Sequence, residues 1–205
     1  MGASVKKALY LGAVIAVAAG AFVGGFLFGK RSKPVAQSGP SGLVLAEYRA
    51  ATFLMEDRLT EAEAAYNELA QRDQLSAGPY VGLAVCRMRR GEFARARELY
   101  EKALVREPTS VGALIGLGSA YAYQSDYSNA AAVYERALSV NEKTADAHWG
   151  LAKAEVNLGE NERARAHLER FKQLDPNSPR AADLESMLGP SPQPDAPPNA
   201  APPPR

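Results

Sequence analysis

A 34-residue period is the feature of this sequence that most constrains its fold. The same three-residue pattern, glycine, leucine and then alanine or glycine, begins at Gly82, Gly116 and Gly150, one full period apart each time. Other positions keep the same phase: Gly91, Ser125 and Gly159, and further on Ala96, Ala130 and Ala164. A fixed period of this length predicts stacked supersecondary units, because one such unit cannot bury its apolar face alone.

Each period contains two helical patterns separated by a break. In one period Tyr80, Leu83 and Ala84 have helical spacing before Gly91, and Leu99 and Tyr100 continue it afterwards. The glycine or serine at the break is typical of a tight turn between antiparallel helices. The sequence therefore predicts helical hairpins, with small residues where the two helices approach closely.

These positions resemble the tetratricopeptide repeat family, whose 34-residue pattern places aromatic, small and proline residues at set offsets. The matching residues are Tyr100, Tyr134 and Leu168, then Ala103, Ala137 and Phe171, and at the end of the units Pro108, Glu142 and Pro176. The resemblance implies an all-α fold: a tetratricopeptide-type α-solenoid of four antiparallel helical hairpins with a C-terminal capping helix.

The predicted repeat domain covers residues 43–188. Its units are 77–110, 111–144 and 145–178, preceded by a fainter unit at 43–76 in which Ala50, Phe53, Ala62, Tyr66 and Leu69 occupy matching places. Residues 179–188 are the expected cap, with Ala181, Leu184, Met187 and Leu188 on its apolar face.

Residues 8–29 carry no charge, and a helix of this length spans roughly 33 Å, enough to cross a bilayer. We predict a transmembrane helix here, after a short tail at 1–7 and before a flexible linker at 30–42. A cleaved signal peptide is the alternative, but Lys30, Arg31 and Lys33 follow the apolar run directly. Spaced glycines in the run allow a weak homodimer through this helix.

The flanking charges nearly balance, so they do not decide the orientation of the predicted membrane helix. We expect a single-pass protein of a bacterial inner membrane with the repeat domain on the periplasmic side. Residues 189–205 are rich in proline and are expected to form a solvated, disordered tail; a ligand for a proline-binding module is the alternative.

The sequence shows no constellation typical of catalysis, so we expect a protein that is not an enzyme and has no cofactor or metal. His148 and His167 belong to the two helical patterns of one unit and have no ligand-spaced neighbours, and Cys86 takes the place of a small buried residue. Residues 43–188 hold 18 Lys/Arg and 22 Asp/Glu, a balance of −4 that argues against nucleic acid as a partner.

In the family that this chain resembles, the first helix of each repeat lines a concave groove that holds peptides. The positions that would line it here are mostly apolar. They are Glu47 and Leu54 in the first unit, Val81, Val85, Met88 and Arg89 in the second, Ile115, Ser119 and Tyr123 in the third, and Trp149, Lys153 and Asn157 in the fourth.

We expect Trp149, Tyr123 and Met88 to anchor an apolar or amphipathic segment of a protein partner, with Arg89 and Lys153 orienting it. The alternative is that Trp149 and Tyr123 only pack between repeats. The predicted function is a membrane-anchored scaffold or assembly factor. The other interpretation is an accessory or regulatory subunit that tethers a membrane-associated enzyme, or a secretion or cytochrome-maturation complex.

Overall fold

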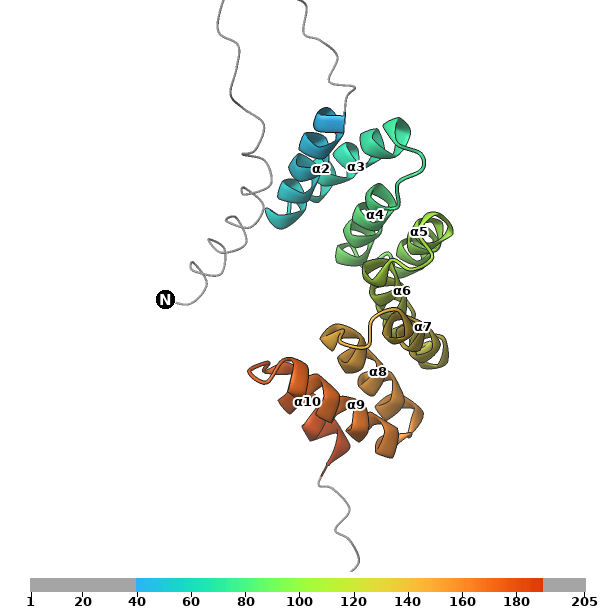
Figure 1. Ribbon diagram of the computed structural model, residues 1–205, viewed down its shortest axis with the longest axis vertical. Helices are drawn as coiled ribbons and strands as arrows, with labels where there is room; N and C mark the ends of the chain where they lie inside the picture. Colours follow the sequence, from blue (N-terminus) through green and yellow to red (C-terminus); the bar gives the residue numbers. More distant parts are fainter. Residues whose placement is uncertain (1–39, 190–205) are drawn as a thin grey trace, which may run out of the picture. The chain divides into compact units, whose positions relative to one another are not determined.

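The computed structural model describes residues 40–189, and this part of the chain consists of helices without any strand (Figure 1). The helices are α2 (Pro40–Met55), α3 (Leu59–Arg72), α4 (Gly78–Arg89), α5 (Phe93–Arg106), α6 (Val111–Tyr123), α7 (Tyr127–Val140), α8 (Ala145–Leu158), α9 (Asn161–Leu174) and α10 (Arg180–Leu188). The predicted all-α solenoid of helical hairpins is therefore confirmed for these residues.

Packing follows the order of the chain. Each helix from α2 to α9 contacts the next, and α2, α4, α6, α8 and α10 also contact one another in succession. We call α2, α4, α6 and α8 the first helices of the four repeats, and α3, α5, α7 and α9 the second helices. Because first helices contact first helices, side chains from successive repeats lie side by side along one row.

Four tight turns join the helices of the hairpins, and each contains one residue with a left-handed backbone. These residues are Asp57, Gly91, Ser125 and Gly159, with φ angles of 59°, 74°, 60° and 79°. They are spaced by the repeat period, and the last three are the breaks that the sequence predicted. Glycine adopts this backbone without the steric penalty that a Cβ atom brings, so two of the four turns have the residue best suited to it.

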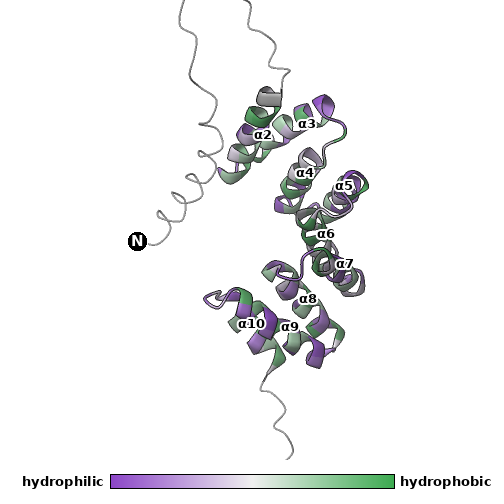
Figure 2. Cartoon of the chain, in the orientation of Figure 1, coloured by the Kyte–Doolittle hydropathy of each residue, from purple (hydrophilic) through white to green (hydrophobic). Residues whose placement is uncertain are grey.

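The core consists of small side chains between the two helices of a hairpin and larger ones between hairpins. Ala96, Ala130 and Ala164 are completely buried, as is Cys86. Helix α6 has no charged residue, and Figure 2 shows it as a largely hydrophobic segment in the middle of the array. The predicted close approach of paired helices through alanine is thus present in the fold.

Both ends of the repeat array differ in detail from the sequence expectation. Helix α2 begins at Pro40, inside the segment predicted as a linker, since proline suits the first turn of a helix. In α10, Leu184 and Leu188 are buried against the last repeat, whereas Met187 is exposed. The apolar face of the cap is therefore narrower than predicted.

The predicted transmembrane helix at 8–29, the short tail before it, the linker up to residue 39 and the proline-rich tail after Gly189 lie outside the described residues. Among the helices of residues 40–189, none combines the length and hydrophobicity required to span a bilayer.

Candidate protein-binding face

The first-helix face comprises the twelve residues that the sequence predicted to line a groove. All twelve belong to α2, α4, α6 or α8, and each keeps part of its surface accessible to solvent. Val81, Val85, Met88 and Ile115 lie at the margin of the central apolar cluster. These four form the apolar middle of the face.

Tyr123 is the most accessible aromatic residue of this face. It ends α6, its exposed fraction is 66%, and its ring stacks on the ring of Phe93 with a centroid distance of 4.7 Å and an interplanar angle of 7°. Phe93 begins α5, so the stack joins two neighbouring repeats. One ring supports the other, and this arrangement offers an aromatic surface whose orientation is already fixed.

Trp149 lies in a different environment. Its ring packs against the cluster of Leu168, Phe171 and Leu184, and its indole N–H donates to the carbonyl of Arg180 at 3.3 Å. The Arg180 guanidinium and the Lys153 ammonium lie over the ring at 5.3 and 5.2 Å. Trp149 therefore connects the fourth repeat to the cap while remaining only partly buried.

The two predicted orienting cations also have partners within the chain. Arg89 donates to the carbonyl of Leu54 at 2.6 Å and to the carboxylate of Asp57 at 3.1 Å, which ties the second repeat to the first. Lys153 lies over Trp149. Arg89 and Lys153 are both exposed, and these interactions hold each positive charge at a defined place on the first-helix face.

Two polar residues of the face contact the neighbouring structure. The Ser119 hydroxyl lies 3.0 Å from the Tyr134 hydroxyl. Glu47 lies against the start of α4, where a Cβ atom on Gly78 would be 2.8 Å from its carboxylate oxygen. A carboxylate is favourable at a helix N-terminus. Leu54 and Asn157, the remaining predicted residues, lie near the ends of α2 and α8.

A buried polar cluster in the fourth repeat is a feature that the sequence analysis missed. Glu155 on α8 has a side chain that is only 1% exposed, with one oxygen 3.2 Å from the Arg163 guanidinium and 3.7 Å from Nε2 of His167. Neither of its carboxylate oxygens has a hydrogen-bond partner. Burial raises the pKa of Glu155 to about 7, and Arg163 only partly offsets this increase.

The two histidines complete this cluster. Nδ1 of His148 lies 3.0 Å from Nδ1 of His167, and Nε2 of His148 lies 2.9 Å from the carbonyl of Glu142. A carbonyl only accepts, so Nε2 of His148 donates to it; with His148 neutral, its Nδ1 accepts from His167. Nε2 of His167 then faces Glu155 without a proton while His167 is neutral. Burial lowers the pKa of His167, which favours this neutral form.

A proton on the carboxyl group of Glu155 therefore removes its repulsion with the lone pair on Nε2 of His167, 3.7 Å away. Within residues 40–189, no group of three or more His, Cys, Asp or Glu side chains is arranged to hold a metal ion. Burial also raises the pKa of the Cys86 thiol, so it is not an activated nucleophile.

The architecture defines an α-solenoid of helical hairpins with an accessible face on its first helices. The model of the tetratricopeptide repeat family matches residues 52–111 and 115–179, and the chain belongs to this family. The tetratricopeptide fold is typically a non-catalytic scaffold for protein interactions. No curated protein sequence matches the chain.

Several solved structures share the fold. The MamA protein is 23% identical, with 71% of this chain and 80% of that chain covered and a TM-score of 0.62. YrrB, described as a tetratricopeptide protein with an unusual peptide-binding site, is 17% identical over 75% and 86% of the two chains, with a TM-score of 0.58. The first repeat domain of Spaghetti (RPAP3), bound to an HSP90 peptide, is 22% identical over 56% and 92%, with a TM-score of 0.54.

Proposed function

We propose that this chain is a membrane-anchored scaffold whose first-helix face binds an apolar or amphipathic segment of a protein partner. The observation that carries the proposal is the Tyr123–Phe93 stack, an accessible and supported aromatic surface on a face that also presents the partly buried side chains of Met88 and Ile115. Aromatic residues and methionine commonly contribute much of the energy of protein interfaces. Of the similar structures, the RPAP3 domain is bound to an HSP90 peptide and YrrB has a peptide-binding site. Both support peptide binding by this chain.

The chemistry of the face favours an apolar segment over an acidic peptide terminus. In the relatives that bind a terminal carboxylate, we expect lysine and asparagine at the places that Val81, Val85, Ile115 and Ser119 occupy here. Arg89 is held by Asp57, and Lys153 lies over an aromatic ring. The face therefore offers an apolar middle with one fixed positive charge on either side.

Site-specific photo-crosslinking in cells that make the full chain tests this proposal. A photoreactive phenylalanine analogue in place of Tyr123 should give a protein adduct, because the position is exposed and lies on α6, one of the two middle first helices. The same analogue in place of Glu98, an exposed residue of second helix α5, is the matched control. Equal adduct formation at both positions, or none at Tyr123, would contradict the proposed face.

The membrane anchor is a separate part of the proposal and is supported by the sequence alone. The uncharged run at 8–29 is long enough to span a bilayer, and the following basic residues favour a retained anchor over a cleaved peptide. We propose an inner-membrane location with the repeats in the periplasm. Protease digestion of intact and opened inverted vesicles tests this orientation: periplasmic repeats should be protected in intact vesicles, and digestion there would reverse it.

A further inference from the structure

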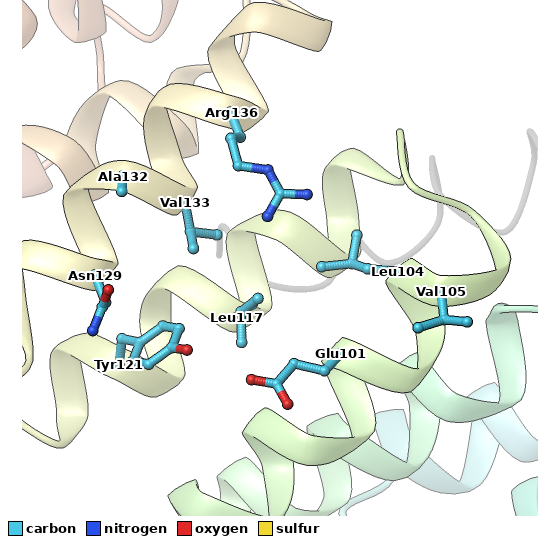
Figure 3. A pocket seen from close by; sticks show the side chains of 9 residues that line it. All are labelled: Glu101, Leu104, Val105, Leu117, Tyr121, Asn129, Ala132, Val133 and Arg136. Atoms are coloured by element: carbon cyan, nitrogen blue, oxygen red, sulfur yellow. The ribbon is translucent and has the colours of Figure 1, made fainter.

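A hollow opens between the second helices α5 and α7 and has α6 as its floor. Its volume is about 450 Å³, and Leu104, Leu117, Tyr121 and Val133 line it with apolar surface (Figure 3). On its rim Val105 is 81% exposed. This inter-repeat hollow is separate from the first-helix face, because most of its lining comes from the second helices.

The register of the repeats shows why the hollow exists at this junction. Tyr121 takes the same place in its repeat as Arg87 in the one before and Glu155 in the one after. Arg87 is ion-paired with Glu63 on α3 and with Glu92, and Glu155 lies against Arg163 on α9. These charged networks occupy the place between second helices at the neighbouring junctions. At the central junction Tyr121 takes this place: the Arg97 guanidinium lies 5.4 Å from the centre of its ring, and the hollow opens beside that ring.

Two charged side chains, Arg136 and Glu101, stand beside the hollow, and the ion pairs of each differ from those of its equivalent in the next repeat. Arg136 on α7 forms no ion pair with any residue in the described range 40–189, whereas Arg170, its equivalent in the next repeat, lies 3.0 Å from Glu142. Among the residues that the structure describes, Glu101 on α5 is ion-paired only with Arg97, at 3.8 Å, whereas the equivalent Glu135 lies 2.7 Å from Arg163. Figure 3 shows both side chains extending toward the hollow.

We propose that this hollow is a second docking site, which takes one bulky apolar side chain of a protein partner while an adjacent carboxylate of that partner pairs with Arg136. The space suits an apolar group, and the guanidinium supplies the charge complementarity that selects an acidic neighbour. The apolar surface continues from the hollow over the exposed side chain of Val105. A ligand that covers both must be longer than one side chain, as a protein segment is. The proposal does not depend on the use of the first-helix face.

Peptide titration of the full chain in a neutral detergent, followed by methyl NMR, tests this site. The probe is the capped tetrapeptide Gly-Phe-Asp-Gly, and the matched controls carry lysine in place of aspartate or alanine in place of phenylalanine. We expect Gly-Phe-Asp-Gly to shift the methyl signals of Leu104, Leu117 and Val133. Both control peptides should bind about threefold more weakly or worse.

The repeat register supplies matched protein variants. Ala132 is an exposed lining residue of α7, and Ala166 is its equivalent on α9. Ala132→Phe should abolish the shifts by filling the hollow, while Ala166→Phe should leave them unchanged. Arg136→Gln should weaken binding by about threefold, the scale of one exposed ion pair, and Arg170→Gln should not. Far-ultraviolet circular dichroism confirms that each variant is folded.

Several outcomes would overturn the proposal. One is the absence of shifts at all three methyl groups with every peptide; another is equal binding of the aspartate and lysine peptides. Equal effects of Ala132→Phe and Ala166→Phe would place the peptide elsewhere. Shifts that appear on concentrating the protein alone would identify a second copy as the occupant, and shifts driven by a fatty carboxylate instead of the peptide would identify a lipid.

Discussion

The ring of Tyr100 on α5 lies directly against the backbone of Gly116 on α6. A Cβ atom on Gly116 would be 2.2 Å from Cζ of that ring, so no larger residue fits without movement. Tyr66 and Gly82, and Tyr134 and Gly150, repeat the relationship with distances of 2.4 Å. At the junction with the cap the corresponding residues are Leu168 and Leu184, which share one apolar cluster. Successive repeats thus pack tightly because a tyrosine ring of one repeat occupies the space beside a glycine of the next.

Gly116→Ala should lower the free energy of unfolding by about 1–2 kcal/mol. Overpacking costs about 1–3 kcal/mol, and the better helix propensity of alanine offsets up to about 1 kcal/mol. Gly112→Ala in the same helix is the control, since nothing lies within 4 Å of its added Cβ atom, and it should be neutral or stabilising. Urea unfolding measures both; equal effects of the two substitutions would show that the Tyr100 contact is not limiting.

The turn between α6 and α7 should become more stable when its left-handed residue is glycine. Ser125 has a φ of 60°, where a Cβ atom is unfavourable, so Ser125→Gly should raise the free energy of unfolding by up to about 1 kcal/mol. The reverse change at the equivalent turn, Gly91→Ala, should lower it by about 1 kcal/mol. Thermal unfolding of both variants checks the opposite signs, and a loss of stability in both would contradict this account.

The two aromatic residues of the first-helix face should respond differently to truncation. Trp149→Ala removes packing against the cap and should cost about 2–3 kcal/mol, somewhat less than a fully buried tryptophan. Tyr123 is largely exposed, so Tyr123→Ala should cost less than about 1 kcal/mol. Chemical denaturation separates the two. A large loss of stability with Tyr123→Ala would mean that its stack on Phe93 mainly stabilises the fold and is not primarily a binding surface.

The repeat period predicted the hairpins because the same few positions in each repeat determine where its turn lies and where its two helices touch. The breaks at Gly91, Ser125 and Gly159 became the left-handed turns, and Ala96 and its equivalents became the contacts between paired helices. These features depend on local backbone conformation and on side-chain size, which a sequence shows directly.

The buried polar cluster and the inter-repeat hollow depend on differences between repeats instead. When the third and fourth repeats are aligned by their period, His148 and Glu155 replace Leu114 and Tyr121, two positions of α6 that are buried or half-buried. Polar residues at such positions, two helical turns apart and therefore on one helix face, are the signal that could have predicted the cluster. At the hollow the same alignment shows Tyr121 in place of Arg87 and Glu155, but it does not show how much space remains between the side chains of α5, α6 and α7.

The Glu155 cluster predicts an unusual dependence of stability on pH. The pKa of Glu155 is raised from 4.5 to about 7 in the folded state, so between these values the folded chain binds more protons than the unfolded chain. Its contribution to stability is therefore full below pH 4.5 and is lost as the pH rises through 7. His167 acts in the opposite sense below 6.5, since its pKa is lowered on folding.

Glu155→Gln isolates the contribution of the carboxyl group. Gln cannot ionise, so the stability of this variant relative to the natural chain should increase steadily from pH 4.5 to about 7, by at most on the order of 3 kcal/mol. Glu135→Gln is the control: it removes an exposed carboxylate from the same Arg163 and should leave the pH profile nearly parallel to that of the natural chain. Free energies of unfolding from urea titrations across this pH range give the comparison. Parallel profiles for the Glu155→Gln variant and the natural chain would mean that Glu155 stays ionised inside the fold, compensated by Arg163.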